Sequence, residues 1–176
     1  GNLIRQVDGN GHITRYEYDD LGRRVATILP MGQRSSRQFD SHGNLTSLTD
    51  FNGDLIRYQR DSQDRLVARL FPDGTSVQFT YTPSGLLATI TDSRGTTAYD
   101  YDSRDRLVSQ TNPDGRVISY TYDQAQNVAS VTIPSGTISY SYDALNRLET
   151  VEDPLGQLTR YAYDAVGRLR TLELPN

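Results

Sequence analysis

The side chains that could carry chemistry in this sequence are few, and most lie in predicted turns. The two histidines, His12 and His42, fall in different turns, and the chain has no cysteine, which excludes disulfides and thiolate metal sites. The stretch Asp8-Gly9-Asn10-Gly11 begins like a calcium-binding loop, but the glutamate that closes such a loop is missing at the required spacing. We therefore predict no metal site and interpret these residues as turn residues.

The carboxylates are numerous, but none stands out as part of a catalytic pair. Glycoside hydrolysis needs two carboxyl groups in one cleft of fixed geometry, whereas the aspartates here recur at a regular interval. The serines also recur in turns and strands, so no Ser/His/Asp arrangement can be placed from spacing. We predict that the chain has no catalytic residue, binds no cofactor and is not an enzyme.

The composition excludes other classes of function. The net charge of −4 leaves no basic footprint for nucleic acid. No stretch approaches the roughly 18 apolar residues of a membrane span, and no secretory signal begins at Gly1, so any export signal is expected elsewhere in a longer parent chain. All 18 basic residues are arginines, either through the base composition of the gene or because arginine forks pair with the many aspartates.

A repeat accounts for most of these residues. All 12 tyrosines fall in two columns that lie two residues apart, and successive copies are separated by 20 or 21 residues. The first column reads Tyr16, Arg37, Tyr58, Phe79, Tyr99, Tyr120, Tyr140, Tyr161, and the second reads Tyr18, Phe39, Arg60, Tyr81, Tyr101, Tyr122, Tyr142, Tyr163. An acidic column follows directly, with Asp19, Asp40, Asp61, Thr82, Asp102, Asp123, Asp143, Asp164. We predict that these aromatic and acidic positions are structural.

Each copy is predicted to fold as a β-hairpin. In the copy from Gly115 to Gly136, Ile118, Tyr120 and Tyr122 alternate with polar or smaller residues, which is the period of a strand. The aspartate that follows can form an Asx turn. The column three residues later is mostly Gly, Asp or Asn and suits a residue with positive φ. Gln126 departs from that column, so we expect it to be strained or to adopt another turn.

The second strand and the returning turn complete the unit. Leu169 and Leu172 are three residues apart, which breaks the alternation and suggests a bulge or twist. The returning turns place Pro at the second position and Gly at the fourth, as in Asn112-Pro113-Asp114-Gly115, which is type I turn chemistry. We predict one all-β array over residues 1–176, with a partial unit at 1–11 and then eight hairpins, or about 17 strands. Tyrosine rings should interdigitate with aliphatic side chains, and their hydroxyls should reach water or aspartate.

The motif at Tyr161-Ala162-Tyr163-Asp164-Ala165-Val166-Gly167-Arg168-Leu169 resembles the YD repeat of the Rhs family, and the resemblance covers the whole chain. The family includes bacterial Rhs polymorphic toxins, the C components of Tc toxins, and teneurins. It implies one long curved or spiralling sheet that forms part of a hollow β-shell. In the bacterial members it implies that the shell encloses a C-terminal toxin domain until delivery. Asp153-Pro154-Leu155-Gly156-Gln157 is partly similar to the family's self-cleavage signature, but it lies in the ordinary turn column.

The resemblance and the pattern together favour a structural wall element, secreted or at the cell surface. A single sheet must cover an apolar face, so the expected partners are the rest of the shell and an enclosed toxin or effector domain. A module that binds carbohydrate or a receptor through its tyrosine stripes stays as the alternative. Unpaired end strands should favour self-association. Arg37 and Arg60 occupy aromatic slots and mark either a local contact or sequence drift.

Overall fold

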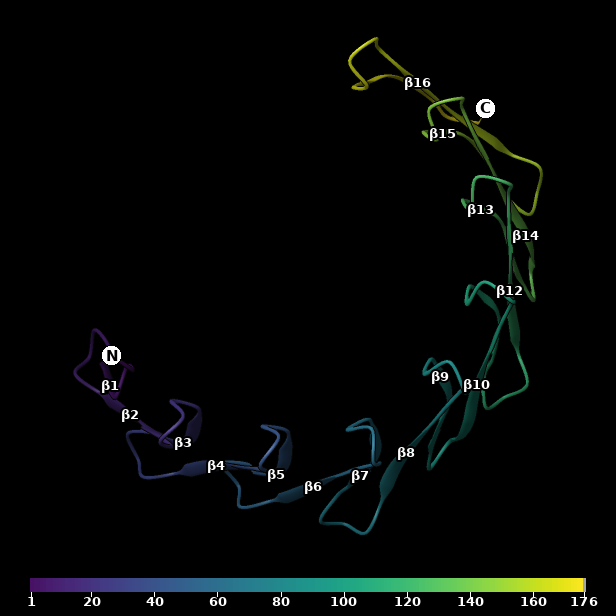
Figure 1. Ribbon diagram of the computed structural model, residues 1–176. Helices are drawn as coiled ribbons and strands as arrows, with labels where there is room; N and C mark the ends of the chain where they lie inside the picture. Colours follow the sequence, from purple (N-terminus) through teal and green to yellow (C-terminus); the bar gives the residue numbers. More distant parts are fainter. Residues whose placement is uncertain (176) are drawn as a thin grey trace. The chain divides into compact units, whose positions relative to one another are not determined.

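The computed structural model describes residues 1–175, which form seventeen strands and no helix (Figure 1). The strands are β1 (Arg5–Val7), β2 (Ile13–Tyr18), β3 (Arg24–Ile28), β4 (Arg34–Phe39), β5 (Leu45–Thr49), β6 (Leu55–Arg60), β7 (Leu66–Leu70), β8 (Ser76–Tyr81), β9 (Leu87–Asp92), β10 (Gly95–Tyr101), β11 (Leu107–Thr111), β12 (Val117–Tyr122), β13 (Val128–Ile133), β14 (Gly136–Tyr142), β15 (Leu148–Glu152), β16 (Leu158–Tyr163) and β17 (Leu169–Glu173). No described helix is long and apolar enough to cross a membrane.

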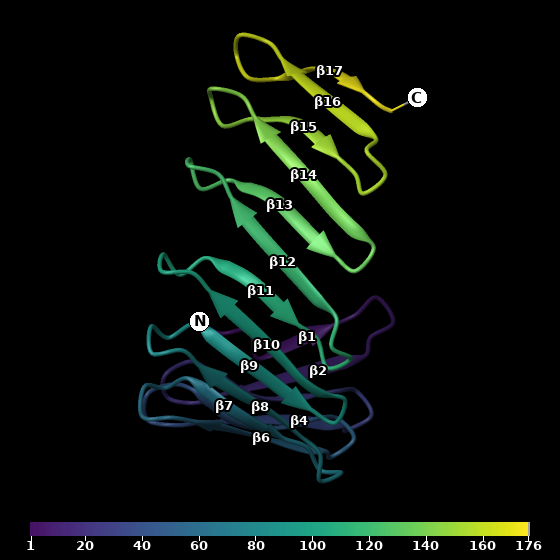
Figure 2. The same cartoon turned by 90° about the vertical axis from the view of Figure 1, so that its right-hand side faces the viewer.

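The strands belong to two compact units, and in each unit successive strands pair antiparallel. The first unit holds residues Gly1–Thr80 with Ile90–Ser93, and the second holds Tyr81–Thr89 with Arg94–Asn176. Hydrogen-bonded pairing runs strand by strand from β1 to β8 in the first unit. It runs in the same way from β10 to β17 in the second (Figure 2). The predicted all-β fold of tandem antiparallel hairpins is therefore confirmed, whereas the treatment of residues 1–176 as a single array stays a prediction.

The turn after each even-numbered strand has a recurrent geometry. In the turn at Asp19, the Gly22 N–H donates to the Asp19 carbonyl at 2.9 Å, and the Asp19 N–H donates to the Arg23 carbonyl at 3.0 Å. This is a three-residue hairpin loop made of a type I turn and a left-handed residue. The four described non-glycine residues with positive φ all occupy that left-handed position: Asp64, Asp105, Gln126 and Asn146. Gln126, at φ 73°, keeps the same turn, so it is strained rather than differently folded.

A β-bulge lies immediately before the second aromatic position of the hairpins. Between β16 and β17, Ala162 pairs with Thr171 and Tyr163 pairs with Leu169, which leaves Arg170 without an opposite residue. The same shift recurs before Tyr18, Phe39, Arg60, Tyr101, Tyr122 and Tyr142. The predicted bulge is confirmed, and it explains why Leu169 and Leu172 share a face although they are three residues apart.

The two lengths of the repeat come from two kinds of returning turn. The turn at Asn112 has three loop residues, because the Asn112 N–H donates to the Arg116 carbonyl at 2.8 Å. At the next return Ile133 pairs directly with Gly136, so only two residues lie in the loop. The short turn brings Gly136, at φ 137°, against the following unit, where a Cβ on this glycine would lie 2.5 Å from Cβ of Pro154.

The array has almost no interior. Ala26 and Ala68 are the buried hydrophobic residues and Ser35 the buried polar one, and no large described side chain is fully buried. Tyrosines face aliphatic residues across the ladder, as in the pairs Tyr120–Val131 and Tyr161–Leu172. Stability must therefore come from contacts between neighbouring hairpins, as in other repeat proteins.

Candidate functional site: the tyrosine–aspartate turns

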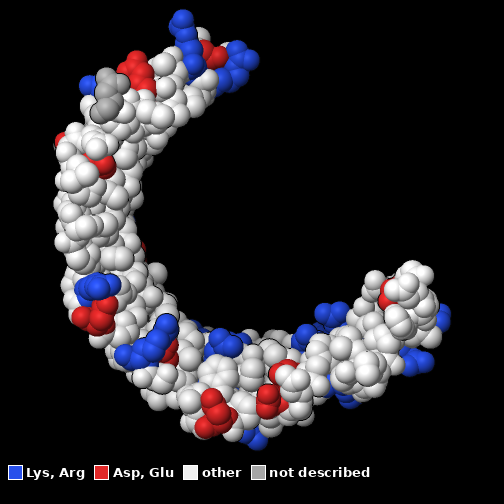
Figure 3. Space-filling view, turned by 180° about the vertical axis from the view of Figure 1, so that it is seen from behind, with Lys and Arg blue, Asp and Glu red and all other residues white. Residues whose placement is uncertain are grey.

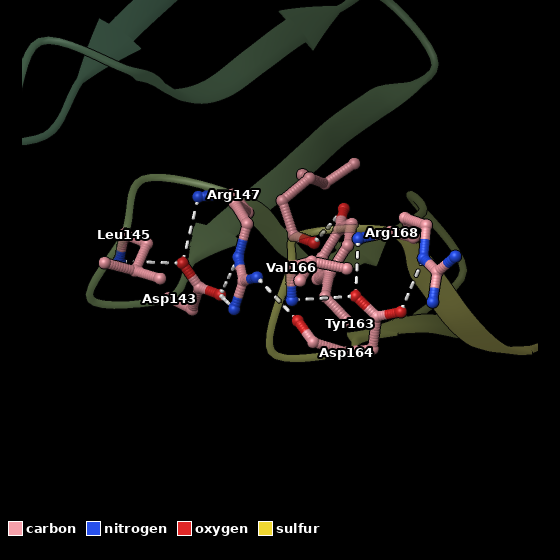
Figure 4. Close-up of polar contacts among 8 residues, drawn as sticks. Asp143, Leu145, Arg147, Tyr163, Asp164, Val166 and Arg168 are labelled. Atoms are coloured by element: carbon pink, nitrogen blue, oxygen red, sulfur yellow. Dashed lines mark hydrogen bonds and ion pairs between the residues drawn. The ribbon is translucent and has the colours of Figure 1, made fainter.

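The aspartate after each aromatic pair organises its turn. In the turn at Asp143, one carboxylate oxygen accepts the backbone N–H groups of Leu145 and Arg147 at 2.9 and 3.0 Å. The other oxygen accepts Nε of Arg147 at 2.7 Å (Figure 4). The Arg147 side-chain hydrogen bond is the main cause of the lowered pKa of Asp143. In the equivalent turn, Arg106 lowers the pKa of Asp102 to about 2.

This pairing of an aspartate with the arginine four residues later recurs along the chain. The pairs are Asp19–Arg23, Asp61–Arg65, Asp102–Arg106, Asp143–Arg147 and Asp164–Arg168. Asparagine replaces arginine at Asp40–Asn44 and Asp123–Asn127 and still donates to the carboxylate. These ion pairs favour the second reading of the arginine-only composition, in which the guanidinium fork is used for carboxylate binding.

The same arginines connect one unit to the next. The guanidinium of Arg147 lies 4.7 Å from the ring centroid of Tyr163, and that of Arg106 lies 4.3 Å from the ring of Tyr122. Arg23 lies in the same way over Phe39, at 4.6 Å. Each arginine therefore contacts the aspartate of its own turn and the ring of the following hairpin, a cation–π arrangement.

Most of the second-column tyrosines bind the preceding hairpin through their hydroxyls. The hydroxyl of Tyr122 donates to the Leu107 carbonyl at 2.8 Å, and that of Tyr163 donates to the Leu148 carbonyl at 3.0 Å. The equivalent bonds are Tyr18 to Leu3, Tyr101 to Leu87 and Tyr142 to Val128. The expectation that these hydroxyls reach water or aspartate is therefore wrong. The reason is that the ladder between β15 and β16 stops at Thr150, so the Leu148 carbonyl lies outside the ladder and needs another donor.

The family follows from the extent of this repeat. The RHS Repeat family model matches residues 1–34, 39–73, 60–97, 101–138, 125–157 and 142–176. The chain belongs to the RHS repeat family. Comparison with curated proteins gave no match.

Solved structures with the same fold are also found. A Photorhabdus luminescens Tc holotoxin pore structure covers 100% of the chain at 18% identity, with a TM-score of 0.69. The TcdB2–TccC3 crystal structure covers 99% at 17% identity, with a TM-score of 0.59. Identity this low shows the fold alone. The chain spans only 12% of the length of each of these two proteins.

The predicted structural positions of this RHS repeat occupy equivalent places. Tyr16, Tyr99, Tyr120, Tyr140 and Tyr161 are first-column residues, and Tyr18, Tyr81, Tyr101, Tyr122, Tyr142 and Tyr163 end the even-numbered strands. Asp19, Asp102, Asp123, Asp143 and Asp164 each accept hydrogen bonds within their turns. The structural role of these residues stays a proposal. Sequence reasoning missed the contacts between units, although the Arg-Leu pair that follows several turns, as at Arg106-Leu107 and Arg147-Leu148, was the available signal.

The histidines lie in turns, each beside carboxylates. His12 Nδ1 lies 3.0 Å from Asp8, whose other oxygen accepts the Asn10 N–H, as in an Asx turn. His42 lies with Asp40 and Asp64, with one potential ligand atom of each within 4.8 Å of the others. The repeat creates this second group, since it places adjacent turns side by side. Both Asp40 oxygens already accept hydrogen bonds from Asn44.

Open hollows occur between returning turns. One in the first unit, of about 640 Å³, is lined by Asp50, Asp54, Ile56, Phe71, Pro72, Asp73 and Thr75. The Asp50 carboxylate accepts the Asn52 and Asp54 N–H groups, and Asp73 accepts Thr75. On the face drawn in Figure 3, charged side chains gather in small groups of both signs among uncharged surface. The Asp50 and Asp73 carboxylates that line the first-unit hollow are thus held by backbone N–H groups of their own turns.

Proposed function

We propose that this chain is a wall segment of a hollow β-shell that encloses a toxin or effector domain of its own parent protein before delivery. The observation that carries the proposal is the joint between units. At the turns of Asp102 and Asp143, one aspartate, one arginine, one ring of the next hairpin and one carbonyl are joined in the same order, and at the hairpin between them Asn127 takes the place of the arginine. Such a joint serves to extend a sheet.

The exposed area supports a role in which the sheet is covered by something else. The chain exposes 11857 Å² at a mass of 19.7 kDa. A compact monomer of that mass exposes roughly 8,600 Å². The difference reflects a layer with two accessible faces, and a sheet normally packs one face against another layer. An enclosed domain would provide that layer.

The relatives support the same role. The TcdB2–TccC3 complex has also been solved without a hypervariable C-terminal region. A variable region that follows a constant repeat array fits a cargo domain behind a wall. By this analogy the parent protein is secreted or displayed at the cell surface. The rest of its shell and its cargo would be its partners.

Protease protection in the natural full-length protein tests the proposal. The domain that follows the repeats should resist digestion while the shell is intact. It should be digested when joints are broken by Tyr122→Ala together with Tyr142→Ala. As a control, Ser119→Ala on the opposite face of β12 should leave protection unchanged. A downstream domain digested equally in all three proteins would contradict enclosure.

Carbohydrate binding is the second candidate, and the hollow beside Phe71 is the observation that favours it. An aromatic ring next to carboxylates suits a pyranose ring. Glycan-array binding by this chain, abolished by Phe71→Ala and retained by the turn variant Gly74→Ala, would support it. Unchanged binding after Phe71→Ala would contradict a site at this hollow.

Association through end strands is a further expectation of the wall model. Among the residues that the structure describes, the partner of β1 within its own unit is β2 alone, and the partner of β17 is β16 alone. All five residues of β17 are exposed. Scattering at increasing concentration should show a rising molecular mass, and a constant monomer mass would contradict this expectation.

A further inference from the structure

Three arginines stand on the aromatic face of the first unit. Arg37 occupies a first-column aromatic position in β4, and Arg60 occupies a second-column position in β6. Arg37 pairs with Leu48, and Leu48 pairs with Ile56 in β6. Because cross-strand partners share a face, Arg37 lies on the same face as Ile56, and therefore as Arg60. Arg69 lies there too, opposite Tyr58.

These arginines have no carboxylate partner in the described part of the chain. Arg37, Arg60 and Arg69 each have one buried nitrogen without a hydrogen-bond acceptor. Arg60 donates through Nη1 to the Asp64 carbonyl, and Arg69 lies 5.4 Å from the Phe71 ring centroid. A half-buried guanidinium without a counter-charge is costly, and such groups in a native fold require an explanation.

The neighbouring strands add no negative charge to balance these arginines. Strands β4 to β7 contain no Asp or Glu within their bounds. Two carboxylates of the neighbouring turns are engaged, since Asp61 binds Arg65 and Asp40 binds Asn44, and the exposed Asp64 carboxylate lies 3.7 Å from His42. The aromatic face of these strands is therefore a cationic surface within a chain whose net charge is −4.

We propose that this surface, made by Arg37, Leu48, Ile56, Arg60 and Arg69, binds an acidic segment of another polypeptide. Charge complementarity selects carboxylates, because guanidinium forks bind carboxylates in planar, bidentate fashion. Arg37, Leu48 and Ile56 are neighbours across the strands, and Tyr58 lies between Ile56 and Arg60 along β6, so apolar and aromatic side chains separate the two arginines. A peptide with carboxylates and an apolar side chain between them can contact both the arginines and the apolar residues of this surface, whereas a free anion can contact only the arginines. The inference does not depend on the shell function.

The test uses this chain and a short capped peptide of alternating glutamate and leucine. Binding is measured by titration calorimetry at low and physiological salt. The key variant is Arg37→Tyr with Arg60→Tyr, which restores the residue found at these positions in other units and so should fold. It should bind at least about tenfold more weakly. Its melting temperature should rise, because two unsatisfied charged groups are removed.

The matched control is Arg57→Tyr. Arg57 is exposed in β6 next to Tyr58 and points to the opposite face, and the change removes the same type of charge. Arg57→Tyr should keep the affinity of the unmodified chain. An equal loss of peptide affinity in the double variant and in Arg57→Tyr would show that only the net charge of the chain matters, and it would overturn the proposal. It would also be overturned by absence of peptide binding to the unmodified chain, or by a sulfated glycan that binds through Arg37 and Arg60 where the peptide does not.

Discussion

Removal of one tyrosine hydroxyl tests the joint between units directly. Tyr122→Phe keeps the ring beneath Arg106, at 4.3 Å, and deletes only the 2.8 Å bond to the Leu107 carbonyl. A typical intramolecular hydrogen bond contributes about 1 kcal/mol net. Because this site is half-buried, water can replace part of the lost bond. We therefore expect the variant to lose about 1 kcal/mol of stability. A fully buried carbonyl left without a hydrogen-bond donor would cost more.

The effect should be local, because each unit is stabilised mainly by its neighbours. Amide hydrogen exchange measures such local opening, and 1 kcal/mol corresponds to about a fivefold loss of protection. The affected amides should be those that hydrogen-bond between β11 and β12, such as Gln110 and Ile118, which form a hydrogen-bonded pair two positions from Asn112 and Arg116. Exchange also avoids the assumption of two-state unfolding, which long repeat arrays can violate.

The control is Tyr120→Phe, which lies on the same strand and face two residues earlier. No hydrogen bond of the Tyr120 hydroxyl occurs within the described residues, so its removal should change protection by less than about twofold. Equal loss of protection in Tyr120→Phe and Tyr122→Phe would refute the reasoning. It would show that the hydroxyl contributes through solvation and not through the bond to Leu107.

Three further outcomes are expected. Gly136→Ala should lower the free energy of unfolding in urea by about 1–3 kcal/mol more than Gly115→Ala does. The reason is that a Cβ at position 136 would lie 2.5 Å from Pro154, whereas a Cβ at position 115 meets nothing within 4 Å. Equal losses in the two variants would mean that the positive φ alone determines the cost of the substitution. Asp102 has its pKa lowered from 3.8 to about 2 in the folded chain, so its contribution to stability is present above pH 4 and is lost as the pH falls toward 2. Asp102→Asn should make melting temperature less dependent on pH over that interval, and an unchanged slope would contradict this. Gln126→Gly should raise stability by about 1 kcal/mol, since a left-handed conformation strains any residue with a Cβ, and a lower melting temperature would show that the strain is absent.

Much of the local architecture could be read from the residues. The alternation around Tyr120 and Tyr122 predicts the strand, and the aspartate and left-handed columns predict the turn. Both are short-range effects: side-chain period 2 defines a strand, and an Asx turn closes within a few residues. The bulge was also recognisable, because the spacing of Leu169 and Leu172 is incompatible with regular alternation on one face.

Only the tertiary structure decided how the units are joined. The Tyr163 hydroxyl reaches Leu148 only because the bulge sets its register and the ladder between β15 and β16 ends early. Neither the register nor the end of that ladder can be predicted from residue spacing in the sequence. The isolation of Arg37 and Arg60 is likewise invisible in the sequence, where aspartates lie only a few residues away. Local patterns determine φ, ψ and the face of each side chain, whereas the partner of a polar group depends on which distant segments the fold brings within hydrogen-bond distance.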